Sequence, residues 1–168
     1  MNNTYHVKVF IADDHPVVAY GVAAMLSKQA EISIVGTARS GNEMSRLLPK
    51  ACPTVLLLDL NMPGSDFYEN IAWVKLHAPW VRVLAYSSYF SSDLVKALLN
   101  EGVKGYLHKS ALPEELTEAV FAISRGETYV ISPATSASDH CIGEVGAVSF
   151  QDDFKKRLGL SRRASRVS

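Results

Sequence analysis

The chain lacks any long apolar segment and contains very few cysteines. None of its stretches approaches the roughly 20 consecutive apolar residues that a membrane-spanning helix needs. Its start has neither the basic residues nor the apolar core of a secretory signal peptide. Its two cysteines, Cys52 and Cys141, have neither metal-ligand spacing nor the density of a disulfide scaffold. We therefore expect a cytoplasmic protein that does not contact membranes and whose reduced thiols have no function.

The chain also lacks net charge, but its charges are unevenly distributed. Residues 1–149 contain 11 Lys and Arg against 15 Asp and Glu, whereas residues 150–168 contain 6 against 2. A length of 168 residues with 48% hydrophobic content is enough for one good core, and it suits a single domain with an appendage. We therefore expect one acidic domain followed by a locally basic tail.

Short apolar runs alternate with segments of helical periodicity along most of the chain. The predicted strands are Val7–Ala12, Ile32–Ala38, Thr54–Leu60, Val81–Ser87 and Gly105–His108. The predicted helices begin at Pro16, cover Glu43–Leu48, Tyr68–His77 and Asp93–Asn100, and end with a helix from Pro113 to Gly126. Five such units predict an α/β fold with a doubly wound parallel sheet and helices on both faces. The flavodoxin-like strand order 2-1-3-4-5 is favoured.

Three carboxylates stand at the ends of two of these apolar runs. Asp13 and Asp14 close the first run, and Asp59 closes the third. Taken singly, an acid at a strand end is more often a turn or helix-capping residue. Because the carboxyl ends of parallel strands open into one crevice, we expect the three acids to lie together there. Crowded carboxylates repel each other unless a cation lies among them, and a set of oxygen ligands favours a hard divalent ion such as Mg²⁺.

Two more polar residues fall at the same edge of the predicted sheet. Ser87 ends the fourth predicted strand, and Lys109 follows the fifth. A carboxylate can attack phosphorus when a metal and a cation neutralise the transferring phosphoryl group. We interpret Asp59 as this nucleophile because it stands alone on the central strand, whereas Asp13 and Asp14 are suited to holding the ion. Lys109 would then pair with one phosphoryl oxygen, and Ser87 would donate a hydrogen bond to another.

These residues lie in motifs that resemble the receiver domain of bacterial two-component response regulators. The motifs are IADDHPVV at residues 11–18, LLDLNMPG at 57–64 and GYLHK at 105–109. The resemblance runs from about Val7 to Arg125. The Asp-Asp-His-Pro form is similar to the NarL/FixJ subgroup, whose members usually carry a LuxR-type helix-turn-helix. The resemblance implies a receiver domain over residues 1–128 that takes part in transcription regulation and is not a turnover enzyme.

The same resemblance implies roles for the acidic residues. A sensor histidine kinase, or a small acyl phosphate in its absence, would phosphorylate Asp59. Asp14 and Asp59 would ligate Mg²⁺ together with the backbone carbonyl of Asn61, and Asp13 would act through water or an outer contact. We interpret His15 as a turn residue near the pocket rather than a ligand, because the site is rich in hard oxygen atoms.

The resemblance also implies a conformational switch. Ser87 corresponds to the switch hydroxyl of the family, Lys109 to its invariant lysine and Tyr106 to its switch aromatic. Movement of Ser87 toward the phosphoryl group would let Tyr106 turn inward and re-form the face made by the fourth helix, fifth strand and fifth helix. That face would bind a partner or form a phosphorylation-dependent homodimer. Taken alone, Tyr106 could equally be a core aromatic. Asn61 and Tyr89 occupy positions where the family tunes the lifetime of the phosphoryl group, and we expect Tyr89 to shield it from water.

The end of the sequence limits the functional prediction. Residues 129–149 are interpreted as a linker, and residues 150–168 as a basic tail that resembles the lead-in to a helix-turn-helix. Only five residues follow Arg163, so no recognition helix is expected to fit. The sequence therefore predicts a truncated regulator or one that works without an effector domain. The tail would contact DNA phosphates weakly and without sequence specificity.

Two other functions stay open. The chain could be a DNA-binding regulator in its own right, which would require the tail to fold on DNA. It could also be a Mg²⁺-dependent phosphatase with an aspartate nucleophile. In that class a second Asp usually follows the nucleophile two residues later, whereas here Asn61 occupies that position.

Overall fold

The computed structural model describes residues 5–131, and the basic tail and most of the predicted linker lie outside the described residues. Strands and helices alternate within this part: β1 (Val7–Ala12), α1 (Pro16–Leu26), β2 (Ile32–Ala38), α2 (Gly41–Ala51), β3 (Val55–Asp59), α3 (Phe67–His77), β4 (Arg82–Ser87), α4 (Ser92–Asn100), β5 (Gly105–His108), α5 (Pro113–Ser124) and β6 (Tyr129–Ile131). The strands form one parallel sheet in the order β2-β1-β3-β4-β5-β6. The flavodoxin-like fold and the order of the five predicted strands are confirmed.

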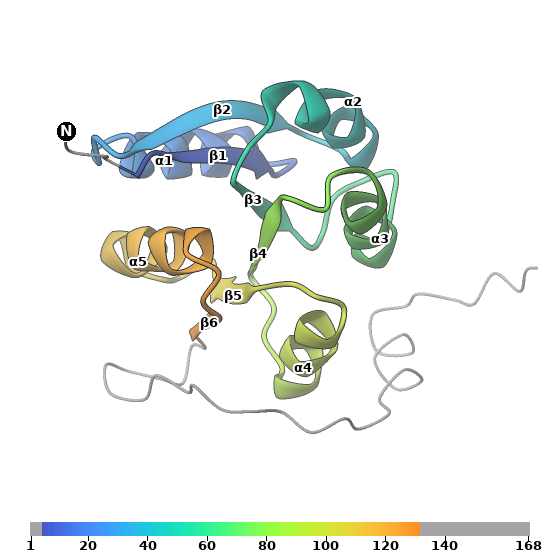
Figure 1. The fold of residues 1–168 in the computed structure, drawn as a ribbon. Coiled ribbons are helices and arrows are strands. Elements are labelled where there is room, and N and C mark those ends of the chain that lie inside the picture. The colour runs from blue at the N-terminus through green and yellow to red at the C-terminus, as the bar shows by residue number, and fades with distance from the viewer. Residues whose placement is uncertain (1–4, 132–168) are drawn as a thin grey trace, which may run out of the picture.

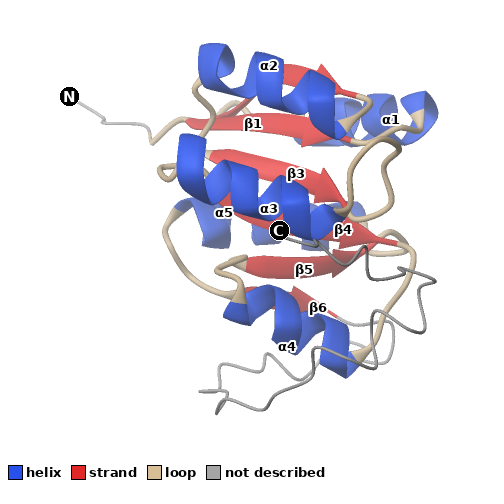
Figure 2. Ribbon diagram, turned by 90° about the vertical axis from the view of Figure 1, so that its right-hand side faces the viewer, coloured by secondary structure: helices blue, strands red, loops and turns tan. Residues whose placement is uncertain are grey.

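The helices cover both faces of the sheet. Helices α1 and α5 lie on one face, and α2, α3 and α4 lie on the other (Figures 1 and 2). Neighbouring residues of β3 point to opposite faces, so Leu56 and Leu58 belong to the core under α2, α3 and α4, whereas Leu57 belongs to the core under α1 and α5. All three leucines are fully or almost fully buried. The continuous apolar run of β3 is therefore what a central strand covered on both sides requires.

Helix caps end the two loops that follow β3 and β4. The Asp66 side chain accepts a hydrogen bond from the backbone N–H of Glu69, and the Glu69 carboxylate accepts one from the backbone N–H of Asp66. This reciprocal cap begins α3 after the loop that follows β3. Ser91 accepts a hydrogen bond from the Leu94 N–H and begins α4 in the same way after β4. Both loops at the carboxyl edge of the sheet are thus anchored at their far ends.

Strand β6 is not among the predicted strands. Its residues, Tyr129–Ile131, fall in the stretch interpreted as a linker, yet they pair in parallel with β5, so that Val130 lies opposite Tyr106. Val130 also contacts the core cluster that contains Tyr106, and the Tyr129 hydroxyl donates a hydrogen bond to Glu118 of α5. The sheet therefore has one more strand beside β5 than the sequence pattern indicated.

None of the helices in the described part of the chain has both the length and the apolar character needed to span a bilayer.

Candidate functional site

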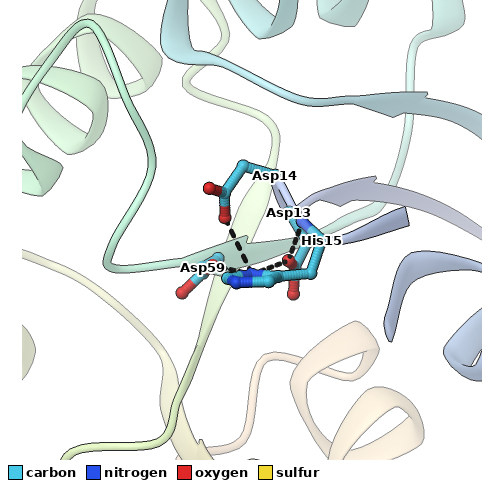
Figure 3. A group of neighbouring side chains, drawn as sticks. All are labelled: Asp13, Asp14, His15 and Asp59. Atoms are coloured by element: carbon cyan, nitrogen blue, oxygen red, sulfur yellow. Dashed lines mark hydrogen bonds and ion pairs between the residues drawn. The ribbon is translucent and has the colours of Figure 1, made fainter. Parts of the chain in front are cut away.

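The three acids predicted from the strand ends lie together at the carboxyl edge of the sheet. Asp13 and Asp14 directly follow β1, and Asp59 is the last residue of the neighbouring strand β3. Asp13 is only 2% exposed and Asp59 only 3% exposed. Figure 3 shows these carboxylates gathered around the imidazole ring of His15. The topology alone therefore forms a buried acidic cluster, as the sequence predicted.

Lys109 reaches this cluster from the end of β5. Its Nζ lies 2.8 Å from Asp13 Oδ2 and 3.1 Å from Asp59 Oδ2. Burial by itself would lower the pKa of Lys109, but the hydrogen bond to Asp13 and the negative charges of Asp59 and Asp13 outweigh it, and the pKa is raised. Lys109 therefore remains an ammonium ion. One ammonium against the three carboxylates leaves the cluster with excess negative charge.

Asp59 is a carboxylate in an environment that disfavours its charge. Burial raises its pKa most strongly, while the Asn61 N–H, which donates to Asp59 Oδ1 at 3.1 Å, and Lys109 lower it; the charge of Asp13 raises it again. The net effect is a raised pKa. A carboxylate whose charge is poorly compensated is a good nucleophile and a good ligand, because either role offsets that charge.

The oxygen atoms of the cluster fit a divalent cation. Asp14 Oδ1 and Asp59 Oδ2 are buried without a hydrogen bond. His15 Nδ1 and Lys109 Nζ lie 2.9 and 3.1 Å from these two oxygens, which is close enough for ion pairing but not in hydrogen-bonding geometry. One ligand atom from each of Asp13, Asp14, His15 and Asp59 lies within 4.8 Å of all the others. Receiver domains bind Mg²⁺ at an acidic pocket of this kind, and the carboxylates present here fit that ion.

Ser87 and Tyr106 are linked through the loop after β4. The Ser87 Oγ accepts a hydrogen bond from the Tyr89 N–H at 3.1 Å, and the Tyr106 hydroxyl donates to the Tyr89 carbonyl. Tyr106 is fully buried beside Phe90, with 5.7 Å between the ring centroids, and burial raises its pKa to about 12. Tyr106 thus already has the inward position that the switch prediction assigns to the phosphorylated form.

The acidic cluster opens into a cavity of about 650 Å³. Its lining includes the polar residues Asp59, Ser87 and Lys109 and the apolar residues Met62 and Leu94. Residues that also line it are His15, Leu60, Asn61, Gly64, Ser65, Asp66, Phe67, Ser88 and Tyr89. The predicted acceptor, switch hydroxyl and lysine therefore share one cavity.

Tyr89 lines this cavity with 43% of its surface exposed. A shielding role for its ring agrees with this position and stays a prediction. Asn61 donates its backbone N–H to Asp59, and the predicted metal contact of its carbonyl also stays a prediction.

His15 lies beside the pocket, as the sequence predicted, and its Nδ1 lies 2.9 Å from Asp14 Oδ1, 3.2 Å from Asp13 Oδ1 and 4.0 Å from Asp59 Oδ2. The only sequence signal was its position directly after the acid pair. Spacing along the chain does not determine the direction of a side chain.

The chain has a flavodoxin-like sheet with three acids, a hydroxyl and a lysine at its carboxyl edge. This combination is typical of signalling receiver domains. The family model of the response regulator receiver domain matches residues 9–121, and the chain belongs to this family. Such domains are signalling modules rather than turnover enzymes, as the sequence predicted.

Several known proteins are similar to this chain. The oxygen regulatory protein NreC of Staphylococcus haemolyticus is 33% identical over 132 residues, which cover 78% of this chain and 61% of NreC. The receiver domain of the putative response regulator NarL from Mycobacterium tuberculosis is 33% identical, with a TM-score of 0.69 and coverage of 73% of this chain and 98% of that one. The NarL/LuxR-type character of the sequence is thereby confirmed. The chain spans about three fifths of the length of the curated relatives it matches.

A second similar structure is the isolated receiver domain of RcsB from Salmonella enterica serovar Typhimurium with the phosphomimetic BeF₃⁻. It is 28% identical, has a TM-score of 0.70 and covers 75% of this chain and 94% of that one. RcsB has also been solved as two dimers bound to two parallel DNAs.

Proposed function

We propose that this chain accepts a phosphoryl group on Asp59 from a sensor histidine kinase, in a reaction that depends on Mg²⁺. The observation that carries the proposal is the buried Asp59 carboxylate, whose Oδ2 lies 3.1 Å from the Lys109 ammonium at the mouth of a cavity. Small acyl phosphates would serve as alternative donors. The kinase and the chain would meet in the cytoplasm.

In the proposed reaction, an oxygen of Asp59 attacks the phosphorus atom of the donor. The P–N bond of a phosphohistidine, or the P–O bond to the acyl group of an acyl phosphate, breaks, and its electron pair leaves with the donor. Lys109 pairs with one phosphoryl oxygen, and the Ser87 hydroxyl donates a hydrogen bond to another. Asp14, Asp59 and the Asn61 carbonyl would hold Mg²⁺, with Asp13 acting through water, and the ion would supply positive charge that offsets the developing charge on the phosphoryl oxygens.

The proposed output is a change at the face formed by α4, β5 and α5. The hydrogen bonds from Ser87 through Tyr89 to Tyr106 give a physical connection between the acceptor and β5. A phosphoryl group that draws in the Ser87 hydroxyl would stabilise this connection and shift the population toward the partner-binding form. By analogy with RcsB, the partner would be a second copy of the chain, and the dimer would take part in transcription regulation.

DNA binding by the chain itself would depend on residues 150–168, which lie outside the described part. The proposal therefore assigns DNA contacts to a complete effector domain. The phosphatase alternative loses support, because receiver domains are signalling modules.

The test is phosphorylation in solution. The purified chain is incubated with acetyl phosphate and Mg²⁺ or with EDTA, and phosphorylated protein is separated on a phosphate-affinity gel. We expect a base-labile product that needs Mg²⁺ and is absent from Asp59→Asn. The matched control is Asp66→Asn, which changes an acid that lines the same cavity but caps α3. Absence of labelling by acetyl phosphate and by a cognate kinase would refute the proposal.

A further inference from the structure

We propose that His108 is a positioning residue for phosphorylation. It ties the loop after β4 to the end of β5, and in this way it holds the Ser87 hydroxyl in place for a phosphoryl group on Asp59. The inference deepens the proposed function and rests on it. His108 lies outside the acidic cluster and would act through the backbone of the loop.

Two backbone groups determine the role of each ring nitrogen of His108. Nε2 lies 2.9 Å from the Ser88 carbonyl oxygen, which can only accept a hydrogen bond, so Nε2 carries a proton. Nδ1 lies 3.2 Å from the backbone nitrogen of Ser110, whose N–H can only donate, so Nδ1 is an acceptor. The Ser110 hydroxyl, 2.6 Å from Nδ1, then donates to the same nitrogen. The ring is therefore hydrogen-bonded at both nitrogens and held in one orientation.

His108 provides the middle one of three hydrogen bonds to the loop after β4. The carbonyl groups of residues 87–89 accept, in order, from the Lys109 backbone N–H at 2.8 Å, from His108 Nε2–H and from the Tyr106 hydroxyl. The first bond continues the pairing of β4 with β5, in which Ser87 lies opposite His108. The other two come from side chains, so they depend on which residues stand at these positions.

The middle bond acts on Ser87 through a single peptide unit. The Ser88 carbonyl and the Tyr89 N–H belong to the same planar group, and in a trans peptide they point in opposite directions. The carbonyl accepts from His108, and the N–H donates to Ser87 Oγ at 3.1 Å. A turn of this plane away from His108 would therefore also remove the hydrogen bond to Ser87.

The orientation of the Ser87 hydroxyl matters for its proposed chemistry. Ser87 lines the same cavity as Asp59 and Lys109. Because Ser87 Oγ already accepts from the Tyr89 N–H, its own proton is directed elsewhere and would be available to a phosphoryl oxygen. By holding the peptide plane, His108 would keep the hydroxyl oriented as a donor before the phosphoryl group arrives.

The alternative is that the His108 ring only packs against the end of the sheet. In that case leucine and glutamine at this position should behave alike. A residue that holds the peptide plane must instead place an N–H group near the Ser88 carbonyl. The side-chain amide of glutamine can supply this group and leucine cannot. The comparison of the two substitutions therefore separates positioning from packing.

The experiment measures how fast the full chain is phosphorylated at low concentrations of acetyl phosphate in Mg²⁺. We expect the rate constant of His108→Leu to fall about two- to tenfold, the factor that one typical hydrogen bond represents. His108→Gln should recover most of this loss. The affinity for BeF₃⁻ should fall in His108→Leu by a similar factor, because a smaller fraction of the chain would have the loop in the binding form.

Amide hydrogen exchange separates a local effect from a general loss of stability. In His108→Leu, the Tyr89 N–H should exchange faster, because the peptide that carries it is no longer held at its carbonyl. The N–H of Leu57, in the central strand β3, should exchange as in the wild type. A general loss of stability would speed the exchange of both groups.

The matched control is His77→Leu. It removes an imidazole whose Nδ1 lies 3.0 Å from the Trp73 carbonyl at the end of α3, and it should leave the phosphorylation rate unchanged. A wild-type rate in His108→Leu, or equal losses in His108→Leu and His108→Gln, would overturn the inference and leave the proposed function intact. Failure of acetyl phosphate and of a cognate kinase to label a folded wild type would refute both.

Discussion

Replacing Lys109 by methionine should destabilise the protein, and Mg²⁺ should restore much of the loss. The change keeps an apolar stem but removes the ammonium that lies 2.8 Å from Asp13 and 3.1 Å from Asp59. At an effective dielectric constant of 20, each contact represents an attraction of about 5–6 kcal/mol before desolvation is counted. Removal of one partner from a buried ion pair costs roughly 3–5 kcal/mol. That is a large share of the roughly 5–15 kcal/mol that stabilises a typical domain.

The dependence on pH has a defined sign. The pKa of Asp59 is already raised in the folded protein, and loss of the Lys109 charge would raise it further. A raised pKa means that the folded state binds the proton more tightly than the unfolded state. The stabilising contribution is therefore complete at acidic pH, below the ordinary pKa of the carboxyl, and is lost as the pH rises through the folded pKa. Lys109→Met should accordingly be closest to the wild type under acidic conditions.

The assay is urea unfolding followed by circular dichroism, in EDTA and in Mg²⁺, at acidic and neutral pH. Lys75→Met is the control, because Lys75 forms an exposed pair with Glu101 at 3.4 Å, which is worth less than about 1 kcal/mol. If Lys109→Met loses the same amount of stability with and without Mg²⁺ and at both pH values, the electrostatic reasoning is refuted. It would instead assign the effect to packing of the lysine against the ring of Tyr86, whose centroid lies 5.6 Å from Nζ.

Three further changes test the surroundings of the site. Tyr89→Ala should shorten the lifetime of the phosphorylated chain, measured as decay on the phosphate-affinity gel, because it removes a half-exposed ring from the cavity wall; an unchanged decay rate would exclude shielding. Burial raises the pKa of Tyr106 from 10.0 to about 12, so its neutral form contributes up to roughly 3 kcal/mol to folding stability below pH 10, and this contribution is lost as the pH rises through about 12. Tyr106→Phe should therefore make the urea midpoint fall less steeply at alkaline pH. An equally steep fall would contradict this assignment. Gly41→Ala should lower the melting temperature, because a Cβ there would lie 1.9 Å from Ser65 Oγ and 2.3 Å from Asn70 Oδ1; a variant as stable as the wild type would mean that the loop after β3 yields freely.

Sequence patterns predicted which residues gather in the acidic cluster, because the topology brings the ends of their strands together. Once apolar runs and helical segments alternate, the ends of β1, β3, β4 and β5 meet at one edge of the sheet. Asp13, Asp59, Ser87 and Lys109 then lie together whatever their rotamers are. The fold and the residues assigned to the site could therefore be predicted without knowledge of any side-chain contact.

Features that depend on rotamers or on very short segments were not predictable in this way. The imidazole of His15 reaches the acids through its side-chain torsions, which spacing along the chain does not encode. The inward position of Tyr106 depends on its hydrogen bond to the Tyr89 carbonyl and on the ring of Phe90. Strand β6 contains only three residues, too few to show a period of two. Pairing with β5, rather than local preference, makes that segment a strand.

The pairing of β6 with β5 has a consequence for any shortened version of the protein. A fragment that stops at residue 128 would lose the row of backbone groups that now covers the outer side of β5, including Val130 opposite Tyr106. Bare N–H and C=O groups along a strand are templates for pairing with other chains, so such a fragment would tend to self-associate whether or not it is phosphorylated. The oligomeric state of such a fragment would then reflect the truncation and not phosphorylation. A receiver fragment that ends after Ile131 keeps this cover and is the appropriate unit for measuring dimerisation.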